Sequence, residues 1–185
     1  MRAATRSLTA ILATILVPAA LAAGAVAPGP GADAFDAAAR LVPPDAVAVV
    51  LVPSPKAASD DLQQALDRMG RAESALGGRP IDLLKAQLGI GPGFDDRGPL
   101  ALWIERRDGT ATAVGAFPVT DAKAFVAGTF TAAPELGAGA YRMAGRDGQR
   151  FFVREAGSHV IVAQDARGAQ GYDPKGGIEI GRAHV

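Results

Sequence analysis

Apolar residues crowd one stretch in the first third of the chain, Ala46 to Val52, where they run almost without interruption. A strand with one wet face alternates apolar and polar positions, whereas a strand buried on both faces does not. The run therefore predicts a strand covered on both faces, in the centre of a sheet rather than at its edge. We expect the rest of the fold to pack around it.

A helical pattern follows this strand directly. Ser54 is a good N-cap, and Pro55 suits the first helical position. Apolar residues then recur at steps of three and four as far as Gly77-Gly78, which predicts an amphipathic helix packed against the preceding strand. The residues that share its apolar face are Ala58, Leu62, Ala65, Leu66, Met69, Ala72 and Leu76.

The remaining pattern predicts three further helices and five further strands. Two Asp-Gly pairs, at 108–109 and 147–148, are strong hairpin signals. The order predicts an α+β fold: a mainly antiparallel sheet with helices packed on it, in ferredoxin-like (split β-α-β) order with extra strands. The expected helices are Ala34–Leu41, Pro80–Leu88 and Ala122–Gly128; the strands are Leu100–Ile104, Thr112–Phe117, Ala140–Met143, Arg150–Arg154 and His159–Ala163.

The N-terminus has the features of an export signal. Arg2 and Arg6 precede an apolar segment, and small-residue cleavage patterns end at Ala22 and at Ala25. The alternative is an uncleaved membrane anchor, but the apolar segment is shorter than the roughly 20 residues of a spanning helix. We expect a signal peptide at 1–25, a linker at 26–40 and an exported α+β domain at 41–165, located in the periplasm or at the cell surface.

The C-terminus has a different character. Residues 180–185, Ile-Gly-Arg-Ala-His-Val, are what a common sequencing-library adapter encodes when it is read in frame. We expect this hexapeptide to be an artefact, and residues 166–179 to be a loop or the start of a truncated element. The alternative is a genuine polar tail.

Composition removes several classes of function. The chain has no cysteine, which excludes disulfides, thiolate metal sites and cysteine nucleophiles. Without Arg2, Arg6 and Arg182, the 19 basic residues fall to 16 against 19 acidic ones, a net charge near −3. The charges are dispersed, and no basic cluster with aromatic residues predicts a nucleic-acid partner. No segment after the signal predicts a membrane span.

Three residues are candidates for chemistry: Asp95, Asp96 and His159. The two carboxylates lie in a glycine-rich stretch and have the oxygen ligands that Ca²⁺ or Mg²⁺ prefers, but the EF-hand spacing is absent. The simpler interpretation is a solvated loop with an Asp–Arg97 pair. His159 lies in a strand pattern, where Ser158 would point to the opposite face, so a structural histidine is the simpler interpretation. We therefore assign no catalytic residue, metal or cofactor.

The stretch from Val42 to Val50, the later strand from Leu100, and the segment from Pro118 to Phe125 together resemble a loose group of exported bacterial proteins of unknown function. In that group, strand–helix modules of this kind recur along the chain. The resemblance covers about 41–165 and implies an exported bacterial α+β protein. It carries over no catalytic residues.

Three hypotheses of function remain, one of which is a truncated module whose functional residues lie in a lost C-terminal part. The first is a non-catalytic periplasmic or cell-surface domain that binds or scaffolds a protein or another envelope component. The alternative is a hydrolase or metal-dependent enzyme that uses Asp95, Asp96 and His159. It requires these three side chains to converge.

Overall fold

The computed structural model describes residues 32–69, 78–107, 109–130, 140–144 and 150–164. The expected signal peptide at 1–25 and the segments 166–179 and 180–185 lie outside these residues. Within the described ranges the chain forms the helices α2 (Ala32–Arg40), α3 (Pro55–Arg68), α4 (Pro80–Leu88) and α5 (Ala122–Thr129). The strands are β1 (Ala48–Val52), β2 (Leu100–Arg107), β3 (Thr110–Pro118), β4 (Ala140–Ala144), β5 (Arg150–Ala156) and β6 (His159–Ala163).

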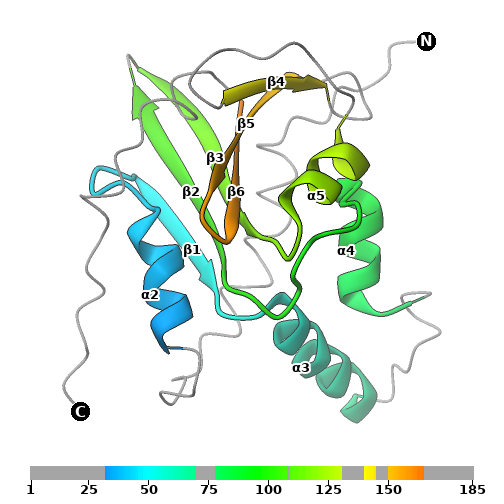
Figure 1. Cartoon of the computed structure of the whole chain (residues 1–185). Coiled ribbons are helices and arrows are strands. Elements are labelled where there is room, and N and C mark those ends of the chain that lie inside the picture. Colours follow the sequence, from blue (N-terminus) through cyan, green and yellow to red (C-terminus); the bar gives the residue numbers. More distant parts are fainter. Residues whose placement is uncertain (1–31, 70–77, 108, 131–139, 145–149, 165–185) are drawn as a thin grey trace, which may run out of the picture.

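The described strands form one sheet in the order β1-β2-β3-β6-β5-β4, and every neighbouring pair is antiparallel (Figure 1). Two three-stranded meanders, β1-β2-β3 and β4-β5-β6, therefore meet along β3 and β6. The expected α+β class with a mainly antiparallel sheet is confirmed. The ferredoxin-like order is wrong, because a split β-α-β unit places a third strand between the two that flank its helix. Here β1 and β2 flank α3 and α4 yet pair directly with each other.

The expected central position of the first strand is also wrong, because β1 lies at one end of the strand order and, among the described strands, pairs with β2 alone. Both of its faces nevertheless touch core residues. Val49 and Leu51 pack against one hydrophobic cluster, while Val50 and Val52 pack against another. A continuous apolar run reports what covers the two faces of a strand; it does not report how many strands lie beside it.

One face of the sheet carries α2. The side chains of Ala38, Leu41 and Val42, at and just after the end of α2, pack against Ala101 and Trp103 of β2. Because side chains alternate along a strand, the same face holds the inward residues of β3 and β6. This end of α2 is therefore part of the core.

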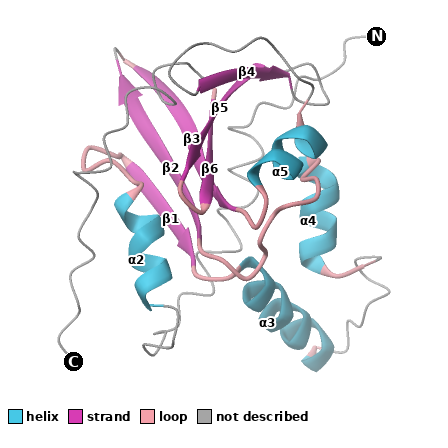
Figure 2. Cartoon of the chain, viewed as in Figure 1, coloured by secondary structure: helices cyan, strands magenta, loops and turns pink. Residues whose placement is uncertain are grey.

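The opposite face of the sheet carries α5 (Figure 2). Phe125 of α5 is fully buried with Val153 of β5 and Val160 of β6, and Phe94 and Phe117 pack around the same cluster. Ring centroids of Phe94, Phe117 and Phe125 lie 5.8–6.5 Å apart, the spacing of favourable aromatic contacts.

The expected packing of α3 against the first strand is not observed. α3 begins as expected, with Ser54 as N-cap and Pro55 in the first turn. It packs on α4 instead, where the buried Ser59 hydroxyl accepts a 3.1 Å hydrogen bond from the Ile81 amide. Figure 1 shows α3 below the sheet, away from the strands. The expected continuation of this helix to Leu76 lies outside the described residues.

Candidate functional site

The candidate carboxylates lie in the connection between α4 and β2, residues 89–99, which we call the 89–99 loop. Main-chain atoms anchor it to β3 and to the β3–α5 connection. The Gly93 carbonyl accepts a 2.8 Å hydrogen bond from the Thr120 amide, and the Asp95 amide donates to the Pro118 carbonyl at 2.9 Å. The loop thus crosses one end of the sheet and is held there by main-chain hydrogen bonds.

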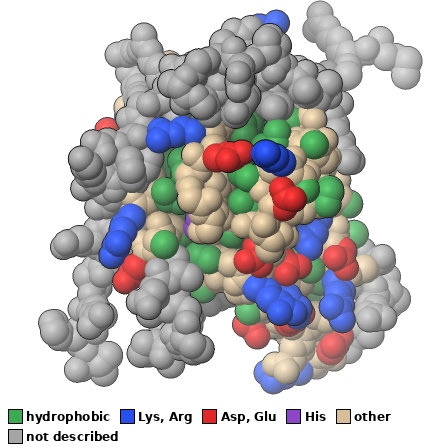
Figure 3. Space-filling model, in the orientation of Figure 1, with side chains coloured by type: hydrophobic (Ala, Val, Ile, Leu, Met, Phe, Trp, Pro, Cys, Tyr) green, Lys and Arg blue, Asp and Glu red, His purple; other side chains and the backbone are tan. Residues whose placement is uncertain are grey.

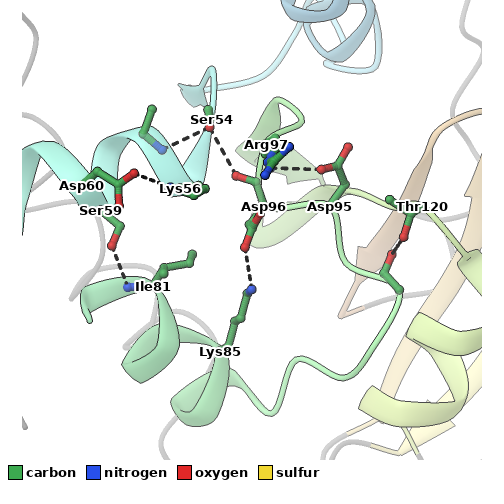
Figure 4. Close-up of polar contacts among 12 residues, drawn as sticks. Ser54, Lys56, Ser59, Asp60, Ile81, Lys85, Asp95, Asp96, Arg97 and Thr120 are labelled. Atoms are coloured by element: carbon green, nitrogen blue, oxygen red, sulfur yellow. Dashed lines mark hydrogen bonds and ion pairs between the residues drawn. The ribbon is translucent and has the colours of Figure 1, made fainter. Parts of the chain in front are cut away.

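Asp96 connects the loop to the two helices α3 and α4 (Figure 4). Its carboxylate Oδ2 lies 2.8 Å from Lys85 Nζ, and both side chains are about 29% exposed. Its main-chain carbonyl accepts hydrogen bonds from the Lys56 amide at 2.7 Å and from the Ser54 hydroxyl at 3.3 Å. The expected pair with Arg97 is therefore wrong: the cation beside Asp96 is Lys85, one turn before the end of α4.

Asp95 turns back on its own loop. Its Oδ1 accepts a 3.0 Å hydrogen bond from the Arg97 amide, the contact by which aspartate commonly closes a turn. The Gly98 amide donates to the Asp95 carbonyl at 3.3 Å. The Asp95 side chain thus bonds within the loop, whereas the Asp96 side chain bonds to Lys85 of α4.

Close backbone approach explains why glycines occupy this loop. A Cβ at Gly91 would lie 2.5 Å from the main-chain carbon of Gly128 in α5. Gly93 has φ +86°, and a Cβ there would lie 2.2 Å from the Asp121 carbonyl oxygen. The glycine-rich composition therefore lets the loop lie against α5, which is a structural role.

His159 lies at the same end of the sheet, at the start of β6, with 3% of its surface exposed. Its Nε2 is 2.9 Å from the Pro99 carbonyl oxygen and its Nδ1 is 3.2 Å from the Ser158 hydroxyl. A carbonyl only accepts hydrogen bonds, so Nε2 of the neutral ring carries the proton and Nδ1 accepts from Ser158. The expectation that Ser158 points away is wrong, because Ser158 lies in the β5–β6 turn rather than in the strand.

Burial lowers the pKa of the His159 imidazole, while its bond to Pro99 and the charge of Asp95 act in the opposite direction. The ring is therefore neutral at pH 7. A neutral imidazole bonded to a backbone carbonyl joins the end of the loop to β6, which fits the expected structural histidine.

The structure brings the three candidates to one end of the sheet without joining them. In the described part of the chain, no hydrogen bond links Asp95, Asp96 or His159 to one another. Within the same residues, no group of three or more aspartate, glutamate or histidine side chains is placed to hold a metal ion.

Two polar pairs were not anticipated from the sequence. Lys85 lies eleven residues before its partner Asp96, too far for a local pattern to reveal the pair. In β2, the Trp103 indole donates a 2.8 Å hydrogen bond to Glu105, and both residues are buried. Their i, i+2 spacing within a strand places both on one face, so this second pair could have been predicted from the sequence.

Comparison of the chain with protein-family models, with curated proteins and with solved structures finds no match in any of the three. The function is therefore argued from the geometry of the described residues alone.

Proposed function

We propose that this protein is an exported, non-catalytic domain of the periplasm or the cell surface that binds or scaffolds an envelope component. The observation that carries the proposal is the use of the candidate polar groups. Asp96 and His159 hold the 89–99 loop to its neighbours, and the Asp95 side chain closes a turn within the loop. Each of these polar groups thus already has a structural partner in the fold.

The class of partner follows from the charge of the chain and from its proposed location. The whole chain has a formal net charge of 0, which becomes near −3 without Arg2, Arg6 and Arg182, and the dispersed charges favour a protein or another envelope component over a nucleic acid. Among the described helices, none has the length and apolar character needed to cross a bilayer. Export is supported by the pattern of residues 1–25 and by the resemblance to exported bacterial proteins.

Export is tested by expressing the chain with a C-terminal tag in a bacterial host and fractionating the cells. We expect the tagged protein in the periplasmic or surface fraction, with a new N-terminus after Ala22 or Ala25. Recovery of the full-length chain from the cytoplasm would contradict the export proposal and leave the fold unaffected.

The absence of turnover is tested with a panel of ester, phosphate and glycoside substrates, with and without added Mg²⁺ or Ca²⁺. We expect no activity above background. Turnover that is lost in Asp95→Ala but retained in Arg97→Ala, with both variants folded, would overturn the non-catalytic proposal.

One observation favours a hydrolase as the second candidate: the Ser158 hydroxyl contacts the Nδ1 of a buried histidine. A serine activated by an imidazole is the core of nucleophilic hydrolysis. A fluorophosphonate probe that labels such serines separates the two proposals. The hydrolase predicts labelling that Ser158→Ala abolishes and Ser54→Ala preserves; the binding domain predicts no labelling of either serine.

A further inference from the structure

Helix α3 carries an apolar stripe that its neighbours leave uncovered. Leu62 is 42% exposed and Met69, at the helix C-cap, is 63% exposed. Ala58 and Ala65 lie on the same side and are also exposed. Large apolar side chains are rarely left in water in contiguous groups unless another surface covers them.

The position of α4 explains why the stripe is open. The side of α3 that faces α4 is centred on Ser59, which bonds to Ile81. With about 100° of rotation per residue, the stripe lies roughly a quarter-turn around the helix from Ser59. The helix thus uses one part of its apolar surface on α4 and leaves the other part free.

The spacing of the stripe is that of a two-helix interface. Ala58, Leu62, Ala65 and Met69 follow one another at steps of four, three and four, the repeat of paired helices. The stripe is short, so the structure favours a modest, reversible association over a large obligate interface.

Charge selects the partner and its direction. Asp61 and Arg68 each come directly before a large stripe residue, on the side away from α4, and both are exposed. When two such helices pair antiparallel, the flanking positions of one helix lie opposite those of the other. Asp61 of each copy then lies opposite Arg68 of the other copy, which gives two such pairs. A parallel pairing would bring them against Ser59 and Leu66, which lack charge. The match is therefore self-complementary in the antiparallel direction.

The polar side of α3 argues against a membrane surface as the occupant. Figure 3 shows charged side chains of both signs over the lower part of the molecule, where α3 lies. The helix carries three aspartates against one lysine and one arginine. A net negative helix is repelled by anionic lipids, whereas surface helices of membranes are rich in lysine and arginine.

We propose that two copies of this chain associate through the α3 stripe, antiparallel, with Asp61 of each copy opposite Arg68 of the other. The interface is isologous, as expected of a two-fold dimer. This inference stands apart from the binding role proposed above, since it concerns self-association and needs no envelope ligand.

The test is sedimentation equilibrium of the mature full chain from about 10 μM to about 1 mM, a range suited to a small interface. We expect a monomer–dimer equilibrium. Asp61→Arg and Arg68→Asp each replace attraction by repulsion and should weaken the dimer by about tenfold. The double variant restores opposite charges and should return the dimer to near its original strength.

Mixing the two single variants gives the sharpest result. Asp61→Arg supplies two positive positions and Arg68→Asp supplies two negative ones, so the mixture should form a heterodimer tighter than either homodimer. The matched control is Asp67→Arg, the same charge change away from the stripe, which should leave the dimer unchanged. Leu62→Gln should weaken it in every background.

Circular dichroism and thermal unfolding of each variant establish that the fold is intact. A mature chain that stays monomeric across the whole range overturns the proposal. So does a dimer that is indifferent to Leu62→Gln and to both charge reversals, because its interface then lies elsewhere.

Discussion

At the scale of single residues, the 89–99 loop depends on two features. Its glycines lack a Cβ, and its carboxylates form hydrogen bonds. Gly93 is the most demanding position, since it combines a left-handed backbone with a carbonyl in the space of a Cβ. Asp95 and Asp96 are the more conspicuous residues in the sequence, but each makes contacts that other polar residues can partly replace.

Gly93→Ala is expected to destabilise the fold by at least about 3 kcal/mol, because the strained φ adds to a clash with the Asp121 carbonyl. Gly157→Ala is the matched control. Gly157 also has a positive φ, +62°, but nothing lies within 4 Å of its Cβ position, so only about 1 kcal/mol is expected. Urea unfolding measures both. Equal losses would show that α5 yields to the added methyl group.

His159 gives the stability a pH dependence. Its pKa in the folded protein is lowered from 6.5. Below that pH, the unfolded chain therefore binds more protons than the folded one. The contribution of the neutral ring is therefore complete above pH 6.5 and is lost as the pH falls through the folded pKa. We expect the free energy of unfolding to decrease as the pH falls below about 6.5.

His159→Gln is the variant that checks this. A glutamine amide can still donate a hydrogen bond to the Pro99 carbonyl, but it does not titrate. Urea titrations at several pH values should show a shallower pH slope for the variant than for the original chain. Parallel slopes would mean that His159 does not govern this part of the pH profile.

At the scale of elements, the helix ends follow local rules and the packing partners do not. Ser54 and Asp121 cap α3 and α5 through hydrogen bonds from the Ala57 and Ala124 amides, as cap preference predicts. The same pattern predicted that the apolar side of α3 packs on β1. This prediction was wrong because an amphipathic stripe shows that one side of a helix is apolar, but it does not show which surface that side packs against.

Ser54 has two roles that one substitution removes together. Its hydroxyl accepts from the Ala57 amide and donates to the Asp96 carbonyl, so it caps α3 and ties it to the 89–99 loop. We expect Ser54→Ala to lower the free energy of unfolding by about 1–2 kcal/mol. Ser54→Thr keeps the hydroxyl and should stay within about 0.5 kcal/mol of the original. A loss as large in Ser54→Thr would point to packing instead.

The sequence predicted the described strands to within a few residues, because hairpin signals and apolar runs are local. It did not predict the strand order. The choice between β1 at the centre and β1 at the edge depends on which backbone groups pair, and all residues except proline carry the same backbone groups. The same limit applies to the site: Asp96 was visible as a carboxylate, but its partners Lys85 and Ser54 come from other elements.

At the scale of the whole molecule, two meanders share one seam between β3 and β6, and β1 and β4 are the outermost of the described strands. The core clusters lie on both faces around that seam. Amides in strands with partners on both sides are protected by the full cooperativity of the fold, whereas edge strands open locally.

Hydrogen exchange should therefore be slowest in β3 and β6 and clearly faster in β1 and β4. Mass spectrometry of exchanged peptides under native conditions measures this directly. Peptides from β2 and β5 serve as an internal reference, since each lies one strand in from an edge. Protection of β1 equal to that of β3 would contradict the described sheet order, or indicate a further partner along the β1 edge.

The 89–99 loop has a consequence for how this fold can change over time. Its outward bonds come mostly from peptide groups: the carbonyls of Gly93, Asp96 and Pro99 accept, and the Asp95 amide donates. Peptide groups survive mutation, so descendants of this chain can exchange most of the loop's side chains while they keep its course. Such descendants would share the spacing of the glycines and the number of residues in the 89–99 loop. A search pattern built on those two properties would recognise them even where Asp95 and Asp96 have been replaced.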